Sequence, residues 1–142
     1  MKINIKGFFQ SLFKGKNKKQ AATMSVSRPV EFIQFRLEQF MHEKKPYLQP
    51  GYTIKHLADD LGIPAYQLSA VINQHIGVHF SDYLNQHRIR YCEEMILREA
   101  GKILSLHDLA EQCGFQNRNT FTAAFKKFTG YTPSDYTKHF LS

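Results

Sequence analysis

Residues 105–136 read SLHDLAEQCGFQNRNTFTAAFKKFTGYTPSDY and contain the signals of two consecutive helices. It opens with Ser105 three residues before Asp108, the pattern of a helix N-cap and capping box. A short helix is predicted from there to Gly114, because glycine tolerates the positive φ of a tight turn. A second helix follows, whose apolar residues recur at helical spacing: Phe121, Ala124 and Phe125. A short helix, a glycine turn and a second helix predict a helix-turn-helix.

The same pattern occurs earlier in the chain, in residues 53–83. Thr53 stands where the later copy has its helix-start serine, and Gly62 stands where it has its turn glycine. Matching positions lie 52 residues apart before the turn and 53 apart after it, so the second copy has one extra residue in its turn. Both copies end in Ser-Asp-Tyr. This internal repeat predicts two helix-turn-helix subdomains.

The rest of the chain also shows helical patterns. Apolar residues on one stripe predict a helix over about 29–44, with Pro29 in its first turn, and the segment KKPYLQPG ends it. A long connecting helix is predicted from about Ser81 to Arg98. Because no alternating β-branched run of strand length occurs, we predict an all-α fold of about seven helices. We expect a leader and linker over 1–28, the first helix-turn-helix subdomain over 29–80, the connecting helix over 81–100 and the second helix-turn-helix subdomain over 101–142.

The positive charge lies outside these subdomains. The chain of 142 residues has a net charge of +7, and residues 1–28 carry all of it, with seven basic residues and no acidic one. Residues 29–142 are therefore formally neutral. Residues 14–28 are predicted to be a flexible linker, and residues 1–13 form a basic amphipathic stretch. Three roles stay open for that stretch: a terminus that packs on the body or frays, a weak membrane-surface contact, or a basic arm on nucleic acid.

Residues 53–89 and 104–136 resemble the C-terminal DNA-binding domain of the AraC/XylS family of bacterial transcription regulators, and the resemblance covers about residues 45–140. Its strongest signature lies in the second copy: Ala110, Gly114-Phe115, Phe121, Phe125-Lys126-Lys127, Gly130 and Pro133-Ser134-Asp135-Tyr136. The resemblance implies that the chain binds double-stranded DNA and activates transcription through RNA polymerase. The lead-in KKPYLQPGYTIKHLA also resembles family members fused to membrane-anchored sensors. In size the chain is more similar to the stand-alone, monomeric members, so a monomer without a ligand-binding domain is expected.

In the second copy, the start of the second helix presents the residues expected to meet DNA. Family positions that read bases fall on Arg118, Asn119, Thr122 and Ala123, and Gln116 and Asn117 precede them. An arginine suits bidentate contact with guanine, an asparagine suits adenine, and an alanine offers only apolar contact to a thymine methyl group. The alternative for Arg118 is a surface salt bridge. Lys126 and Lys127 lie a turn further on, where they either contact phosphate or are hydrated on an exposed face of the helix.

The first copy is less basic. Its second helix offers Tyr66, Gln67, Ser69, Ala70 and Asn73 without a lysine or arginine, and Pro64 replaces the usual capping serine. We therefore expect this copy to make backbone and shape contacts more than base readout. On the connecting helix, Arg88 and Arg90 either reach phosphate or pair with Glu93 and Glu94 at helical spacing. Cys92 and Cys113 are interpreted as buried small residues, with a redox-sensing role as the alternative.

Other classes of function find little support. His75 and His79 have the spacing of a helical metal pair, but Gly77 between them is expected to break the helix. No glycine-rich phosphate loop or nucleophile elbow occurs, so neither an enzyme nor a cofactor is expected. No apolar run is long enough to span a bilayer and no secretory signal is found, which favours a cytoplasmic protein. The competing hypothesis is a protein-interaction module that its amphipathic N-terminus holds at the membrane surface.

Overall fold

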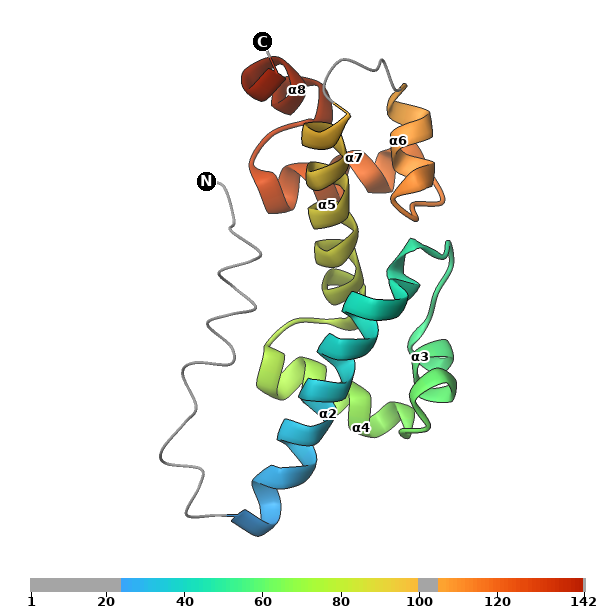
Figure 1. The fold of residues 1–142 in the computed structure, drawn as a ribbon, viewed down its shortest axis with the longest axis vertical. Coiled ribbons are helices and arrows are strands. Elements are labelled where there is room, and N and C mark those ends of the chain that lie inside the picture. Colours follow the sequence, from blue (N-terminus) through green and yellow to red (C-terminus); the bar gives the residue numbers. More distant parts are fainter. Residues whose placement is uncertain (1–23, 100–104, 142) are drawn as a thin grey trace. The chain divides into compact units, whose positions relative to one another are not determined.

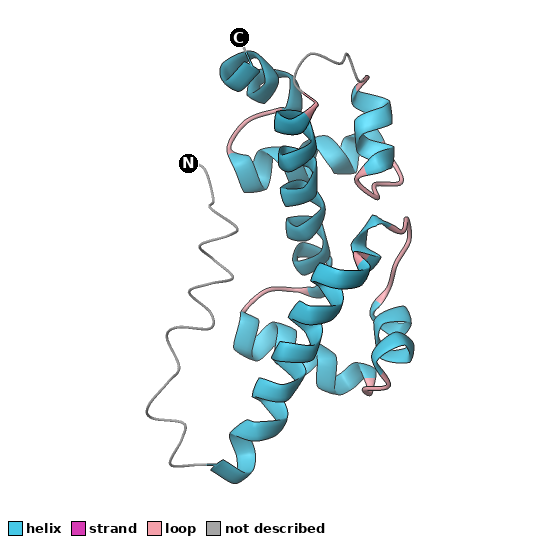
Figure 2. Cartoon of the chain, viewed as in Figure 1, coloured by secondary structure: helices cyan, strands magenta, loops and turns pink. Residues whose placement is uncertain are grey.

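The computed structural model describes residues 24–99 and 105–141. Within these ranges the chain forms helices and connecting turns without a strand, which confirms the all-α prediction (Figure 2). The α-helices, labelled in Figure 1, are α2 (Met24–Lys44), α3 (Ile54–Leu61), α4 (Ala65–Ala70), α5 (Phe80–Arg98), α6 (Leu106–Gln112), α7 (Arg118–Thr129) and α8 (Pro133–Leu141). A short 3₁₀ turn, η2 (Pro46–Leu48), and a π-helical turn, η3 (Val71–Ile76), complete them. The amphipathic stretch 1–13 lies outside the described residues.

The chain divides into two compact units, each with one helix-turn-helix. Among the described residues, the N-terminal unit contains 24–46 and Tyr52–Tyr83, and thus α2, α3, α4 and η3. The C-terminal unit contains Tyr47–Gly51 together with the described residues that follow position 83. It includes most of α5 and the helices α6, α7 and α8.

Helix α2 supplies the long face of the N-terminal unit. Its residues Ile33, Leu37 and Met41 recur every four positions and are buried, so they form the stripe expected of an amphipathic helix. The predicted start at position 29 was wrong, because the helix begins at Met24. Proline has a φ compatible with a helix and removes one backbone hydrogen bond, so the residues before it can also be helical at that cost. The predicted linker is correspondingly shorter, and what remains of it, 14–23, lies outside the described residues.

The two helix-turn-helix copies start with similar caps. Thr53 Oγ1 accepts the His56 N–H at 3.3 Å while His56 Nδ1 accepts the Thr53 N–H at 3.0 Å, which completes a capping box. Ser105 Oγ accepts the Asp108 N–H at 3.0 Å, as predicted. The Asp108 carboxylate, however, accepts the Ser105 hydroxyl at 2.6 Å, so the expected box takes a different form. Both turn glycines are left-handed, with φ of 65° at Gly62 and 89° at Gly114.

The repeat extends further than the sequence predicted. The hydroxyl of Tyr83 donates to Glu38 Oε1 on α2 at 3.3 Å, and the hydroxyl of Tyr136 donates to the carboxylate of Glu93 on α5. Both tyrosines are buried, and burial together with the neighbouring carboxylate raises the pKa of Tyr83. Each helix-turn-helix therefore packs against the long helix that precedes it. A glutamate of that long helix accepts a hydrogen bond from the tyrosine at the end of the copy. Helix α2 does for the first copy what α5 does for the second.

Candidate nucleic-acid interface

Helix α7 is the second helix of the second copy, and its two sides differ sharply. Its N-cap is Asn117, whose Oδ1 accepts the Thr120 N–H at 2.8 Å. One side is buried in the C-terminal unit through the residues Phe121, Ala124, Phe125 and Phe128. Phe121 stands edge-on to Phe115 before the helix and to Phe125 one turn later, with ring centroids 5.3 and 5.8 Å apart. This aromatic packing fixes which side of α7 faces outward.

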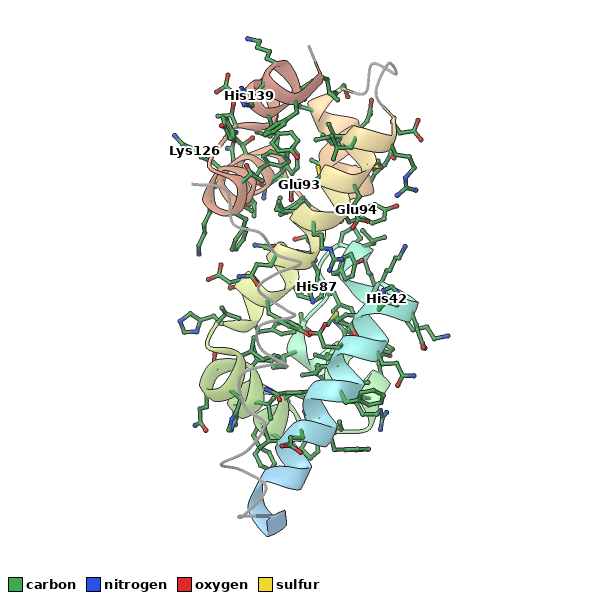
Figure 3. All side chains as sticks on the ribbon, turned by 60° about the vertical axis from the view of Figure 1, so that its left-hand side comes forward. His42, His87, Glu93, Glu94, Lys126 and His139 are labelled. Carbon is green, nitrogen blue, oxygen red and sulfur yellow. The ribbon has the colours of Figure 1, made fainter. Side chains whose placement is uncertain are left out.

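The outward side carries the residues that the sequence predicted for DNA contact. They form two rows with a spacing of four residues: Arg118, Thr122 and Lys126 in one, and Asn119, Ala123 and Lys127 in the other. All are exposed except Thr122, which is half-buried. Lys126, labelled in Figure 3, extends away from the ribbon, whereas Lys127 Nζ lies 5.5 Å from the centre of its neighbour's ring, Phe128. Gln116 and Asn117 are exposed just before the helix.

The first copy has a different surface. Helix α4 contains only six α-helical residues and continues as the π-helical turn η3, which ends at Gly77 with φ of 85°. Tyr66 is 73% exposed, and its hydroxyl accepts a hydrogen bond from Gln67 Nε2 at 3.2 Å. Asn73 is exposed, whereas Ser69 and Ala70 are half-buried, and neither α4 nor η3 contains a lysine or arginine. The predicted surface residues thus lie together, but they form a short and uncharged patch.

Helix α4 has no side-chain cap at its start and continues as a π-helical turn at its end. Pro64 is the N-cap of α4 and provides no side-chain hydrogen bond, as its place in the sequence indicated. The turn η3 was not predicted. The N–H of Gly77 donates to the carbonyl of Ile72 at 2.8 Å, a separation of five residues. The predicted break between His75 and His79 is confirmed, because η3 ends at Ile76 and α5 begins at Phe80.

The two arginines of the connecting helix have different surroundings. Arg90 Nε lies 3.4 Å from Glu94 Oε1, so Arg90 forms the i, i+4 pair that the sequence allowed. The guanidinium of Arg88 instead donates to Asn85 Oδ1 at 3.1 Å and to backbone carbonyls before α3. Neither arrangement tests a contact with phosphate, which stays a prediction for both residues. A half-buried guanidinium with three internal acceptors nevertheless favours an internal role for Arg88.

Buried polar and sulfur groups lie behind this surface. Cys92 and Cys113 are both fully buried, as predicted, and burial followed by a hydrogen bond with Cys113 raises the pKa of the Cys92 thiol. His87 is also buried, stacked on Tyr47 with ring centroids 5.2 Å apart. Burial, helped by the positive charge of Arg90, lowers the pKa of His87 to about 3. These groups belong to the core and have no access to a ligand at the surface of α7.

Comparisons with known proteins agree with this architecture. Residues 57–139 match a family model described as a helix-turn-helix domain. The chain is 26% identical over 109 residues to the transcriptional regulatory protein HptR of Staphylococcus aureus, and the match covers 77% of this chain and 42% of HptR. It is 36% identical over 74 residues to the transcriptional activator RhaR of Yersinia pseudotuberculosis, with 52% of this chain and 24% of RhaR covered. The chain therefore spans less than half the length of these curated relatives.

A solved structure supports the fold. The C-terminal domain of AraT, a response regulator from Geobacillus stearothermophilus, superposes with a TM-score of 0.65. The match covers 83% of this chain and 91% of that domain at 24% sequence identity. The architecture of two helix-turn-helix copies around long helices is thus found in a known protein.

Proposed function

The chain belongs to the AraC/XylS family of helix-turn-helix proteins, and we propose from this membership that it is a sequence-specific DNA-binding transcription regulator. The observation that carries the proposal is the two-sided helix α7. Its aromatic side is buried, while its first turn presents Arg118 and Asn119 to solvent. Those residue types match the hydrogen-bonding edges of guanine and adenine in the major groove.

In the proposed complex, α7 enters a major groove with its N-terminal half. Arg118 makes a bidentate contact with guanine, Asn119 contacts adenine, and Ala123 packs on a thymine methyl group. Lys126, one turn further along the same row as Arg118, contacts a phosphate and contributes affinity without sequence preference. Thr122 lies between these two contacts and is half-buried, so its hydroxyl has a shorter reach.

The first copy makes a smaller contribution to specificity. Its helix α4 enters the neighbouring major groove about one helical turn away, roughly 34–36 Å along the duplex. Because α4 and η3 have no lysine or arginine, we assign this copy backbone and shape contacts. The exposed ring of Tyr66 is the largest side chain available for a base contact there. The two copies of one chain replace the two subunits of a dimer, so the chain binds as a monomer.

The regulator acts as an activator in the cytoplasm, where bacterial promoters are. The name of RhaR, which describes an activator, supports this direction of regulation. Contact with RNA polymerase is part of the proposal because the resemblance to the family implies it. None of the helices that the structure describes is long and apolar enough to cross a membrane.

Selection from a library of random DNA duplexes tests the proposal. The wild-type chain is expected to enrich two blocks of sequence whose centres lie about 10–10.5 base pairs apart, with the stronger preference in one block. A library in which no sequence is enriched after several rounds would refute sequence-specific recognition. Two blocks of equal strength would refute the unequal roles of the two copies.

A further inference from the structure

The segment between α2 and α3 lies against the turn of the second helix-turn-helix. We call Tyr47–Gly51 the strap; it belongs to the C-terminal unit although its neighbours on both sides in the chain belong to the other unit. A Cβ added at Gly114 would collide with the carbonyl oxygen of Tyr47 and lie 2.9 Å from Leu48 Cα. A Cβ added at Gly51 would lie 3.0 Å from Gln116 Nε2. The backbones of strap and turn therefore approach each other as closely as glycine allows.

Arg88 on α5 joins the strap to the turn. Its Nε donates to the carbonyl oxygen of Tyr47 at 2.6 Å, and its Nη2 donates to that of Gln49 at 3.4 Å. The guanidinium carbon also lies 5.5 Å from the centre of the Phe115 ring, within the turn itself. The third nitrogen, Nη1, donates to Asn85 Oδ1 at 3.1 Å and so fixes the guanidinium plane. One side chain thus holds two backbone carbonyls of the strap and covers the aromatic residue of the turn.

The side chain of Tyr47 fixes the strap a second time. Its ring stacks on His87 and stands edge-on to Tyr91, with centroids 5.2 and 6.5 Å away. Both partners are on α5, the helix that also carries Arg88. The strap is consequently held to α5 through its backbone and through an aromatic side chain. It forms a fixed support on which the turn of the second helix-turn-helix rests.

We propose that Arg88 is a positioning residue for DNA recognition and acts through the strap, not through a contact with phosphate. The supported turn ends at Gln116, two residues before Arg118, which makes the proposed guanine contact. Binding sites need their groups held to within about 0.5 Å, so release of the turn reduces specific recognition. This inference rests on the proposed function, because it concerns how the same surface meets DNA.

The two roles of Arg88 predict different behaviour. A phosphate contact depends on charge, so lysine would largely replace arginine, and its removal would lower the salt dependence of binding by about one phosphate. A positioning role depends on the planar fork of donors, which lysine lacks. Loss of a positioning residue leaves the number of phosphate contacts unchanged. It lowers the affinity for the preferred DNA sequence more than the affinity for an unrelated sequence. Sequence preference and salt dependence together separate the two roles.

The test compares Arg88→Lys, Arg88→Gln and Asn85→Ala with wild type and with Arg98→Gln, an exposed arginine at the end of the same helix. The probes are the duplex enriched by the wild-type chain and a scrambled duplex of the same composition, each titrated at several salt concentrations. Both Arg88 variants are expected to bind the enriched duplex about tenfold more weakly, and Asn85→Ala about threefold. Affinity for the scrambled duplex, and the salt dependence, should stay within twofold of wild type.

The proposal is overturned if Arg88→Lys binds like wild type. It is also overturned if Arg88→Gln weakens binding to both duplexes equally and lowers the salt slope by about one, the value for one lost phosphate contact. If the Arg88 variants fail to fold, Asn85→Ala decides alone, since it removes only one acceptor of the guanidinium. Amide hydrogen exchange without DNA gives an independent readout. Exchange of the Gly114 and Phe115 amides, which donate to the carbonyls of Glu111 and Ala110, should rise at least tenfold in Arg88→Gln and stay unchanged in Arg98→Gln. If no duplex is enriched, the proposed function fails, and exchange still decides whether Arg88 holds the turn.

Discussion

At the scale of single residues, Arg118 has the most specific role in the proposed complex. Its side chain is exposed at the first position of α7, at the edge of the buried aromatic side, where no earlier turn of the helix covers it. Arg118→Ala is expected to cost about 1–3 kcal/mol on the enriched duplex and to relax the preference at one base pair. The measurement is a fluorescence-anisotropy titration against duplexes that vary at single positions.

Lys126→Ala is the matched control for Arg118→Ala, because both residues lie in the same exposed row. It should weaken binding to enriched and scrambled duplexes alike and lower the salt slope by about one. If Arg118→Ala behaved in the same way, with every base preference intact, Arg118 would be a phosphate contact and the assignment of base reading to it would be wrong.

His87 provides a prediction that does not involve DNA. Its pKa is about 3 in the folded chain, against an ordinary value of 6.5, because it is buried and lies near Arg90. The folded state therefore favours the neutral ring, and this contribution to stability is present above pH 6.5 and is lost as the pH falls toward 3. Between pH 7 and pH 5 it amounts to about 2 kcal/mol.

Urea unfolding at the two pH values measures this contribution, with His87→Phe as the comparison. The variant keeps an aromatic ring against Tyr47 but cannot bind a proton. Between pH 7 and pH 5 its free energy of unfolding should therefore fall by about 2 kcal/mol less than that of the wild type. Equal pH dependence in wild type and variant would mean that His87 accepts a proton in the folded chain, and that its burial is not what the structure indicates.

At the scale of elements, the two turn glycines are equivalent in the repeat but not in their surroundings. Gly62 has no atom within 4 Å of an added Cβ, whereas at Gly114 such an atom meets the backbone of the strap. Both have positive φ, so alanine costs about 1–2 kcal/mol at either position from backbone strain alone. Gly114→Ala should cost at least about 2 kcal/mol more than Gly62→Ala, measured by urea unfolding. Equal costs would show that the strap does not lie against the turn.

The helices that depend on local signals could be predicted from the sequence. Thr53 and Ser105 mark helix starts through side-chain oxygens, and the spacing of Phe121 and Phe125 marks a buried helical side. The π-helical turn η3 could not be predicted in this way, because an α-helix satisfies the same apolar pattern over a stretch this short. The early start of α2 was missed since Pro29 is typical of a first turn but tolerated later.

The exposure of the α7 residues could be predicted from the sequence, whereas the contacts behind that helix could not, and the role of these residues in DNA binding stays a prediction. The exposure of Asn119 and Ala123 follows from their place opposite the buried phenylalanines, and Arg118 is exposed because it begins the helix at the edge of that buried side. The contacts of Arg88 with the strap could not be foreseen, because they join residues about 40 positions apart through backbone carbonyls. Neither Tyr47 nor Gln49 has a side chain that indicates such a contact in the sequence.

At the scale of the whole chain, the repeat is a helix-turn-helix together with the long helix before it. The hydroxyls of Tyr83 and Tyr136 donate to Glu38 and Glu93 in matching places, so the two units use the same device to close their cores. They differ in the surface they present. Helix α7 of the second copy has exposed arginine and lysine side chains, and α4 and η3 of the first copy have none, although residues 29–142 as a whole are formally neutral. Placement of charge, more than its total, distinguishes the two units.

Recognition of a particular DNA sequence by this chain can be measured as the ratio of two affinities. The dissociation constants for the enriched duplex and for its scrambled counterpart are measured at one physiological salt concentration. We expect the enriched duplex to bind at least about 10³-fold more tightly, as specific protein–DNA complexes do. A ratio within about threefold of one would contradict it, because binding would then depend on the phosphate backbone alone.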